Sequence, residues 1–287
     1  MQIRIAPKAG FCFGVKRAYK LALEATQNKQ GKVYSLGPLI HNPQAVAQLE
    51  REGLRVIPTP EEADPRSTIV IRSHGASPGV LQWSREREIS VVDATCPFVK
   101  KAQDNLVQLE GEGYQVVVVG DRDHPEVVSI VGHARSPVIV VSHAGELLDY
   151  QLQRKIGVIA QTTQSLRNLQ EVVSALLEYA SDLKILNTIC NATTVRQEAT
   201  LDLAREVDLM IVVGGKNSAN TRRLAQICKE VLEDTLHVET AEEISPTWLV
   251  GKERIGVTAG ASTPDWIVSQ VIEKLKELGS ELEGNKT

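Results

Sequence analysis

Short apolar runs alternate with longer stretches of helical periodicity along the chain. The runs are rich in β-branched residues, as strands are, and they lie at 32–36, 68–71, 116–119, 138–141, 155–159, 209–213 and 254–257. Between them, segments such as 99–110 carry apolar residues at helical spacing against charged neighbours. This alternation of strands and helices predicts an α/β fold with parallel sheets.

A second pattern divides the chain into thirds. Cys12, Cys96 and Cys190 lie about one third of the chain apart, and each follows a strand-like segment and precedes a helical one. We therefore predict three similar α/β lobes with small, mainly parallel sheets. Their expected arrangement is a pseudo-threefold trefoil around a central cavity that holds a metal cluster.

The repeat also predicts boundaries. Residues 1–13 would form an N-terminal strand that leads to the first cysteine, and the lobes would cover 14–96, 97–191 and 192–287, the last with a C-terminal tail. Each cysteine-bearing strand precedes its helix across a lobe boundary. We therefore expect the strand at 3–7 to join the sheet of the third lobe.

The three repeated cysteines stand where a helix begins, and the helix dipole there favours the thiolate, a strong ligand of soft metals. Structural zinc sites usually use local C-x-x-C pairs, and the chain has none. Three thiolates on a four-iron cluster would instead leave one iron open for a ligand. Cys228 differs, because it lies in the apolar stripe of a helical segment, and we interpret it as inert packing.

Polar residues gather where the predicted strands end, which is the edge at which open α/β sheets bind ligands. Most are neutral hydrogen-bond donors: His41, His74, His124, Thr162, Thr163, Ser218, Asn220 and Ser262. Such a set suits a phosphate or diphosphate. Glu126 lies in the sequence His-Pro-Glu, and we predict it to be the proton donor, because burial beside a diphosphate would raise its pKa.

Composition and charge exclude several functions. The chain has 287 residues, 42% of them apolar, and a formal net charge of -4 without a block of lysine or arginine, so no nucleic-acid partner is expected. No apolar run has the length of a membrane span, and the N-terminus lacks a secretory pattern. Walker, G-x-G-x-x-G and H-E-x-x-H motifs are absent. We expect a protein of the cytoplasm, or of the plastid stroma if a transit peptide has been removed.

Several motifs occur in a characteristic order. They are Gly-Phe-Cys-Phe-Gly-Val at 10–15, Leu-Ile-His-Asn at 39–42, Ser-His-Gly at 73–75, Asp-Ala-Thr-Cys-Pro at 93–97, His-Pro-Glu at 124–126, Gln-Thr-Thr at 161–163, Ile-Cys-Asn-Ala-Thr-Thr at 189–194 and Thr-Ala-Gly-Ala-Ser at 258–262. Through these motifs, which span nearly the whole chain, the sequence resembles the 4-hydroxy-3-methylbut-2-enyl diphosphate reductase family, also called IspH or LytB.

The resemblance implies an iron–sulfur enzyme. Cys12, Cys96 and Cys190 would hold a [4Fe-4S] cluster with one open iron site for the hydroxyl oxygen of an allylic diphosphate. The implied substrate-binding residues are His41, His74, His124, Thr162, Ser218, Asn220 and Ser262. The implied catalytic residues are Glu126, His124 and Thr162.

The implied reaction is the last step of the non-mevalonate (MEP) isoprenoid pathway. Two electrons and protons would remove the hydroxyl oxygen as water, giving isopentenyl diphosphate and dimethylallyl diphosphate. The chain has no flavin or nicotinamide motif. Electrons would therefore come from a separate carrier, by family analogy ferredoxin or flavodoxin.

One residue departs from the family pattern, and two other functions compete with the reductase. Ala219 lies where the family commonly has a second serine, so one diphosphate contact worth about 1 kcal/mol would be missing. The first alternative is a zinc-dependent hydrolase of a diphosphate, with Glu126 as base. The second is an iron–sulfur redox sensor that binds a phosphorylated metabolite, although the sequence has no basic helix-turn-helix as an output segment.

Overall fold

The structure is a computed structural model that describes residues 1–28 and 31–284. The end of the predicted C-terminal tail, 285–287, lies outside the described residues. The chain divides into two compact units. The first unit consists of Met1–Phe13, His41–Ala45 and Asn191–Thr287, and the second consists of Gly14–Ile40 and Val46–Cys190. Within the described residues, no helix is both long and apolar enough to cross a membrane.

The first unit contains one parallel sheet in which the N-terminal strand pairs with strands from the end of the chain. Its strands are β1 (Gln2–Ile5), β10 (Leu209–Val213), β11 (Thr235–Val238) and β12 (Arg254–Ala259), in the order β1-β12-β10-β11. Ile3 lies opposite Ile255 in the register of β1 and β12. The expectation that the first strand joins the C-terminal sheet is therefore confirmed.

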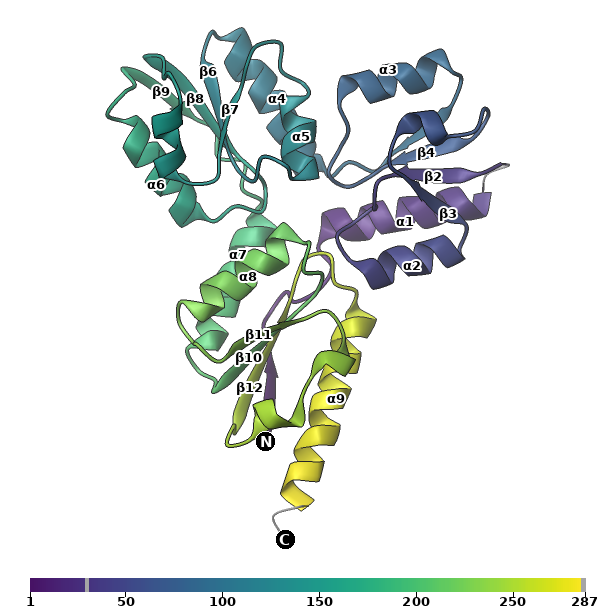
Figure 1. Ribbon diagram of the computed structural model, residues 1–287, viewed down its shortest axis with the longest axis vertical. Coiled ribbons are helices and arrows are strands. Elements are labelled where there is room, and N and C mark those ends of the chain that lie inside the picture. Colours follow the sequence, from purple (N-terminus) through teal and green to yellow (C-terminus); the bar gives the residue numbers. More distant parts are fainter. Residues whose placement is uncertain (29–30, 285–287) are drawn as a thin grey trace. The chain divides into compact units, whose positions relative to one another are not determined.

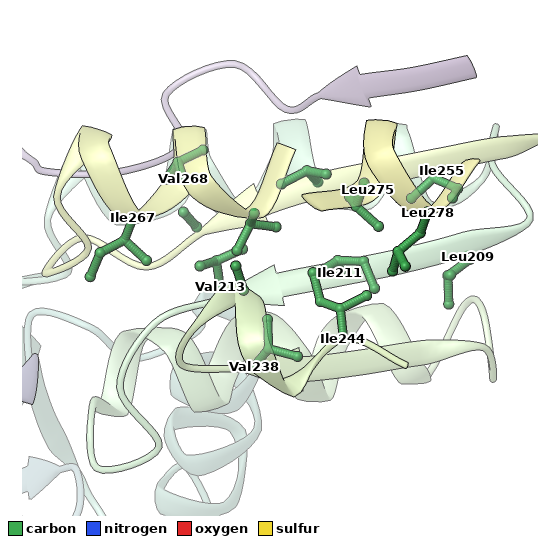
Figure 2. Packing of buried hydrophobic residues seen from close by; sticks show 14 of the residues in the cluster. Leu209, Ile211, Val213, Val238, Ile244, Ile255, Ile267, Val268, Leu275 and Leu278 are labelled. Atoms are coloured by element: carbon green, nitrogen blue, oxygen red, sulfur yellow. The ribbon is translucent and has the colours of Figure 1, made fainter. Parts of the chain in front are cut away.

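Helices cover both faces of this sheet (Figure 1). They are α7 (Asn191–Ala204) and α8 (Ala219–Lys229) on one face, and η3 (Ala241–Glu243), η4 (Pro246–Leu249) and α9 (Asp265–Gly284) on the other. Ile211 and Val213 of the central strand β10 point toward α9 (Figure 2), whereas Met210 and Val212 pack against α7 and α8. Since both faces of β10 are buried, its sequence is continuously apolar rather than alternating.

The second unit contains two further parallel sheets. One has β2 (Val33–Leu36), β3 (Leu54–Ile57), β4 (Thr68–Ile71) and β5 (Ser90–Asp93), in the order β3-β2-β4-β5. The other has β6 (Gln115–Val119), β7 (Ile139–Val141), β8 (Lys155–Ala160) and β9 (Asp182–Ile185), in the order β7-β6-β8-β9.

Helices accompany these two sheets as well. The first sheet is associated with α1 (Phe13–Asn28), α2 (Pro43–Arg51), η1 (Pro60–Glu62) and α3 (Pro78–Glu86). The second is associated with α4 (Pro97–Gly111), α5 (Pro125–Val131), η2 (Ala144–Asp149) and α6 (Leu166–Leu176). The cores show that α4 and α5 pack on one face of the second sheet, and η2 and α6 on the other.

All three sheets share one topology. The strands β2, β6 and β10 occupy equivalent positions, and each pairs with the next strand of the chain on one side and with the one after that on the other. A fourth strand completes the edge, and β1 takes that place in the sheet of the first unit. The predicted α/β class with three small parallel sheets is thus confirmed. The boundaries drawn between lobes at 13/14, 96/97 and 191/192 stay predictions.

Candidate functional site

Equivalent loops follow β2, β6 and β10, which occupy the same position in the three sheets, and each loop carries a predicted site residue. The strands β2, β6 and β10 end near Gly37, Gly120 and Gly214, whose backbone N–H groups each donate to the neighbouring strand at 2.8 Å. Four residues after each glycine stands a predicted diphosphate ligand: His41, His124 or Ser218. The repeated topology therefore places these three residues at corresponding strand ends.

Two of these residues also begin a helix. His124 precedes α5, and its Nδ1 accepts the backbone N–H of Glu126 at 3.1 Å. Because Nδ1 is the acceptor, the neutral ring carries its hydrogen on Nε2, where it can be donated to an anionic oxygen. Ser218 caps α8 in a similar way, by accepting the N–H of Thr221 at 3.4 Å.

A second set of repeated loops anchors the three cysteines. The backbone N–H of Cys96 donates to the carbonyl of Ser73 at 3.0 Å, next to His74. The N–H of Cys190 donates to the carbonyl of Thr162 at 3.0 Å. The N–H of Cys12 donates to the carbonyl of Ala261 at 3.1 Å, next to Ser262. Each cysteine is therefore fixed to a loop that carries a predicted substrate-binding residue.

The repeated cysteines differ from the fourth one in their surroundings. Cys12, Cys96 and Cys190 are half-buried, and each immediately precedes a helix, α1, α4 or α7. A thiol at a helix start with partial access to solvent suits metal ligation. Cys228 is fully buried in the core beneath α8, and burial raises its pKa to about 12. Its environment is that of a packing residue.

The first unit gathers neutral donors around the start of α8. The hydroxyl of Ser262 donates to the carbonyl of His41 at 3.0 Å and lies 3.3 Å from the Oγ of Ser218. A Cβ on Gly215 would lie 2.5 Å from that same carbonyl oxygen, so only glycine allows the two loops to approach so closely.

Asn220 is the unsatisfied member of this group. The side chain is 3% exposed, and neither its Oδ1 nor its Nδ2 has a hydrogen-bond partner among the described residues. Leaving a buried polar group without a partner costs about 1–3 kcal/mol, so folded proteins rarely do so without a reason. A polar ligand that reaches the start of α8 would satisfy this amide.

The second unit contains a buried carboxyl group with two dedicated donors. Thr162 donates its backbone N–H to Oε1 of Glu126 at 2.6 Å and its hydroxyl to Oε2 at 2.9 Å. Both bonds favour the carboxylate, but burial outweighs them and raises the pKa of Glu126 to about 7. A carboxyl group that is half protonated near neutral pH can deliver a proton and recover it.

Two histidines of the second unit contact each other, and one of them, His124, precedes Glu126 by two residues. The rings of His74 and His124 meet edge to face, with their centroids 5.4 Å apart. His124 also contacts Glu126 through the Nδ1 bond described above. The structure therefore brings together His74, His124, Glu126 and Thr162 within one unit.

Two structural residues of the site loops carried no role in the sequence analysis. Gln161 is buried, accepts the N–H of Asp121 at 2.9 Å and donates to the hydroxyl of Thr163 at 3.1 Å. Thr163, predicted as a ligand donor, thus helps to brace its own loop. The hydroxyl of Thr188 accepts the N–H of Ala160 at 2.9 Å and steadies the approach to Cys190. The bonds between Gln161 and Asp121 and between Thr188 and Ala160 join residues far apart in the sequence, so no local pattern indicates them.

Comparisons with known proteins agree with these observations. The family model described as LytB protein matches residues 3–276. The chain is 52% identical over 280 residues to the 4-hydroxy-3-methylbut-2-enyl diphosphate reductase of Geobacter metallireducens, covering 98% of this chain and 99% of the relative. The relative of the same name from Geobacter sulfurreducens is 50% identical, over 99% of this chain and the full length of the relative.

Solved structures are similar too. One described as (E)-4-hydroxy-3-methyl-but-2-enyl diphosphate reductase, the terminal enzyme of the non-mevalonate pathway, is 48% identical, with a TM-score of 0.72 over 96% of this chain and 99% of that chain. The corresponding reductase from Plasmodium falciparum shares the fold, with a TM-score of 0.91 at 24% identity, over 95% of this chain and 87% of that chain. From its motifs, its three repeated sheets and these matches over nearly its whole length, we conclude that the chain belongs to the LytB protein family.

Proposed function

We propose that the protein is a 4-hydroxy-3-methylbut-2-enyl diphosphate reductase. In this reaction two electrons and two protons cleave the carbon–oxygen bond of the allylic alcohol, releasing one water and leaving isopentenyl or dimethylallyl diphosphate. The observation that carries the proposal is the buried pair of Glu126 and Thr162 in a chain that matches reductases of that name over nearly its full length.

The residues present fit an iron–sulfur cofactor. The proposed ligands of a [4Fe-4S] cluster are Cys12, Cys96 and Cys190, which leave one iron open. Their half-buried thiols at helix starts and their anchored backbones are properties of metal ligands, and thiolates are the usual ligands of such clusters. When bound, the cluster supplies single electrons and a Lewis-acidic iron for the substrate oxygen.

The polar loops fit the diphosphate. Ser218, Asn220 and Ser262 of the first unit offer hydroxyl and amide groups at the start of α8, where the backbone N–H groups and the helix dipole also favour an anion. The imidazoles proposed for the same task are His41, His74 and His124. Asn220 supports this assignment most strongly, because a phosphate oxygen or a substrate hydroxyl would satisfy its buried amide.

Glu126 is the proposed proton donor, with Thr162 and His124 as its partners. The two hydrogen bonds from Thr162 hold both carboxyl oxygens, and burial keeps the proton on the group up to about pH 7. Thr162 would position the substrate hydroxyl beside this proton. His124 begins the helix that carries Glu126, so it couples substrate binding to the position of the carboxyl group.

The electron donor and the compartment follow from the same proposal. A ferredoxin or flavodoxin would deliver the electrons one at a time, since the sequence has no nicotinamide or flavin motif. The expected compartment is the cytoplasm, or the plastid stroma if a transit peptide has been removed.

Anaerobic turnover tests the proposal. The protein, reduced by dithionite through a viologen dye, is expected to consume the allylic diphosphate and to form isopentenyl and dimethylallyl diphosphate, measured by mass spectrometry. Release of inorganic phosphate without any need for a reductant, from protein that contains zinc, would favour the hydrolase instead. Binding of the diphosphate without turnover by iron-loaded, reduced protein would favour a sensor.

A further inference from the structure

The loop in front of Cys96 is held by an arginine from the helix that follows Cys12. Arg17 lies on α1, and its Nη1 and Nη2 donate to the carbonyls of Thr95 at 3.2 Å and Asp93 at 3.4 Å. These carbonyls belong to the residue next to Cys96 and to the last residue of β5. The guanidinium group of Arg17, on the helix that follows Cys12, therefore fixes the loop that leads to Cys96.

The loop in front of Cys12 is held in the same manner from the helix that follows Cys190. Arg196 lies on α7, and its Nε and Nη2 donate to the carbonyls of Lys8 at 2.9 Å and Gly10 at 2.8 Å. The side chain is only 2% exposed, so a permanent charge is buried here. The backbone that it holds is unusual, because Lys8 and Gly10 both have positive φ, at 63° and 92°.

Arginine is suited to this task for two reasons. Its planar fork presents several N–H groups at once, so it can hold two carbonyls of a strained loop, and it stays charged at every relevant pH. Burying a charge costs several kcal/mol, which is offset only by well-placed hydrogen bonds and nearby opposite charge. The negative charge of thiolate ligands beside both loops would offset part of this cost by attracting the guanidinium groups.

The arginine contact does not recur in all three repeats. The helix that follows Cys96 is α4, and the buried polar side chain on it, Gln103, donates to the hydroxyl of Ser129 at 2.8 Å. The loop in front of Cys190 is instead braced by Thr188, whose hydroxyl accepts the N–H of Ala160 at the end of β8. An arginine thus holds two of the three cysteine loops. Arg17 lies on the helix after Cys12 and holds the loop of Cys96, and Arg196 lies on the helix after Cys190 and holds the loop of Cys12.

We propose that Arg17 and Arg196 are positioning residues for the cluster, which fix the loops of Cys96 and Cys12 and place permanent positive charge near the thiolates. The inference rests on the proposed function, because it needs a cluster at these cysteines. Addition of an electron makes a thiolate-bound cluster more negative, and nearby positive charge favours that step. Both arginines therefore raise the reduction potential and slow the loss of iron.

The test replaces each arginine in two ways. Arg17→Met and Arg196→Met remove both the charge and the hydrogen bonds, whereas Arg17→Lys and Arg196→Lys keep the charge and lose the fork. Arg167→Met is the control, because Arg167 is an exposed residue on α6 that pairs with Glu171. Each anaerobically reconstituted protein is measured for iron and sulfide content, for the rate of iron loss to a chelator, and for its midpoint potential by EPR-monitored titration.

The two substitutions have different expected results. In the methionine variants the ratio of reduced to oxidised cluster at a fixed potential falls about tenfold, equivalent to about 59 mV for one electron. In the lysine variants the ratio of reduced to oxidised cluster returns to within about twofold of the wild-type value, while iron is still lost about tenfold faster than from the wild type. Arg167→Met behaves like the wild type in every measurement.

Two outcomes would overturn the inference. The first is methionine variants that retain iron and titrate like Arg167→Met. The second is lysine variants whose potential stays at the methionine value, which would show that positive charge has no part. If Arg196→Met does not fold, the lysine variant and the two variants of the half-buried Arg17 still decide the matter. A wild-type protein that binds no iron would contradict the proposed function, not this assignment alone.

Discussion

The two units present site residues of opposite character. In the first unit, Ser218, Asn220 and Ser262 are neutral donors, and the amide of Asn220 is buried without a partner among the described residues. In the second unit, Glu126 is titratable, and both of its oxygens are already satisfied by Thr162. The first group is incomplete without a ligand, whereas the second is complete in itself.

This difference separates two tasks. Neutral groups that lack partners gain hydrogen bonds only when an anion arrives, so they contribute to binding. A carboxyl group with a pKa of about 7 and fixed partners keeps its geometry and changes only its proton, so it contributes to the chemical step. Substitutions in the first unit should therefore raise KM, and those at the carboxyl group of the second unit should lower kcat.

The largest effect is expected at the cysteines, on which both tasks depend. Replacing Cys12, Cys96 or Cys190 by serine should remove the iron and all detectable turnover together, because a serine hydroxyl is a poor ligand for iron–sulfur clusters. Iron content and turnover are measured on the same samples. Cys228→Ser is the matched control and should retain both, and a variant of Cys12 that kept full iron and rate would contradict the ligand set.

The next effect is expected at Glu126. Glu126→Gln should lower kcat by about 100-fold to 10,000-fold with little change in KM, because it removes proton delivery and preserves the size of the side chain. The amide oxygen can still accept the N–H of Thr162, and the hydroxyl of Thr162 can turn to accept from the new NH2 group. In the wild type the rate should fall as pH rises above about 7, since the carboxyl group loses its proton there. Near wild-type turnover in the variant would remove Glu126 from the reaction.

The same substitution should stabilise the protein in alkaline solution. Glu126 keeps its proton in the folded chain up to about pH 7, whereas the unfolded chain loses it near the ordinary value of 4.5. The folded state therefore binds more protons in this window, and its stability falls as pH rises from 4.5 to 7. Glu126→Gln should raise the free energy of unfolding at pH 8 by roughly 1–3 kcal/mol. Chemical denaturation of the variant and the wild type at pH 5 and pH 8 measures the free energy of unfolding. An equal increase in the variant at both pH values would contradict the raised pKa of Glu126.

Asn220 should behave in the opposite way to the carboxyl group. Asn220→Ala should raise KM about tenfold to 100-fold, as expected for lost hydrogen bonds to a charged ligand, and change kcat little. The stability of the substrate-free protein should not fall, because the amide has no hydrogen-bond partner in the part of the chain that the structure describes. A variant that loses stability and keeps its KM would show that the amide supports the fold instead.

The smallest effect is expected next to Asn220. Ala219→Ser would restore the serine common in the family at the start of α8. One ordinary hydrogen bond is worth about 1 kcal/mol, so substrate affinity should improve by less than about tenfold. Isothermal titration measures the change, and a gain far above tenfold would mean that the missing hydroxyl is a principal ligand.

Sequence patterns predicted the parts of the fold that depend on burial. The central strands are apolar on both faces, so β6 and β10 stand out as continuous runs. The repeat around the cysteines correctly placed the first strand in the C-terminal sheet. The edge strands β3 and β11 escaped prediction, because Arg55 and His237 interrupt short segments that are buried only in part.

The sequence could propose the residues of the candidate site but not their contacts. Strand-end position and residue type singled out Glu126, Thr162 and Asn220. The bond between Thr162 and Glu126 joins loops from different strands, and its geometry follows from the register of the sheet. The hydrogen bond from Arg196 to the carbonyl of Lys8 joins residues 188 positions apart in the chain, and no local pattern indicates it. Long-range polar contacts need the fold before they can be seen.

The proposed function requires one cluster and one allylic diphosphate to bind at the same site. The direct test begins with anaerobic purification and analysis of iron and sulfide. EPR spectra of the reduced protein are then recorded before and after addition of the allylic diphosphate. The protein is expected to be brown and to give a four-iron EPR signal that changes when substrate is added. Colourless protein with stoichiometric zinc, or a cluster signal indifferent to the substrate, would contradict it.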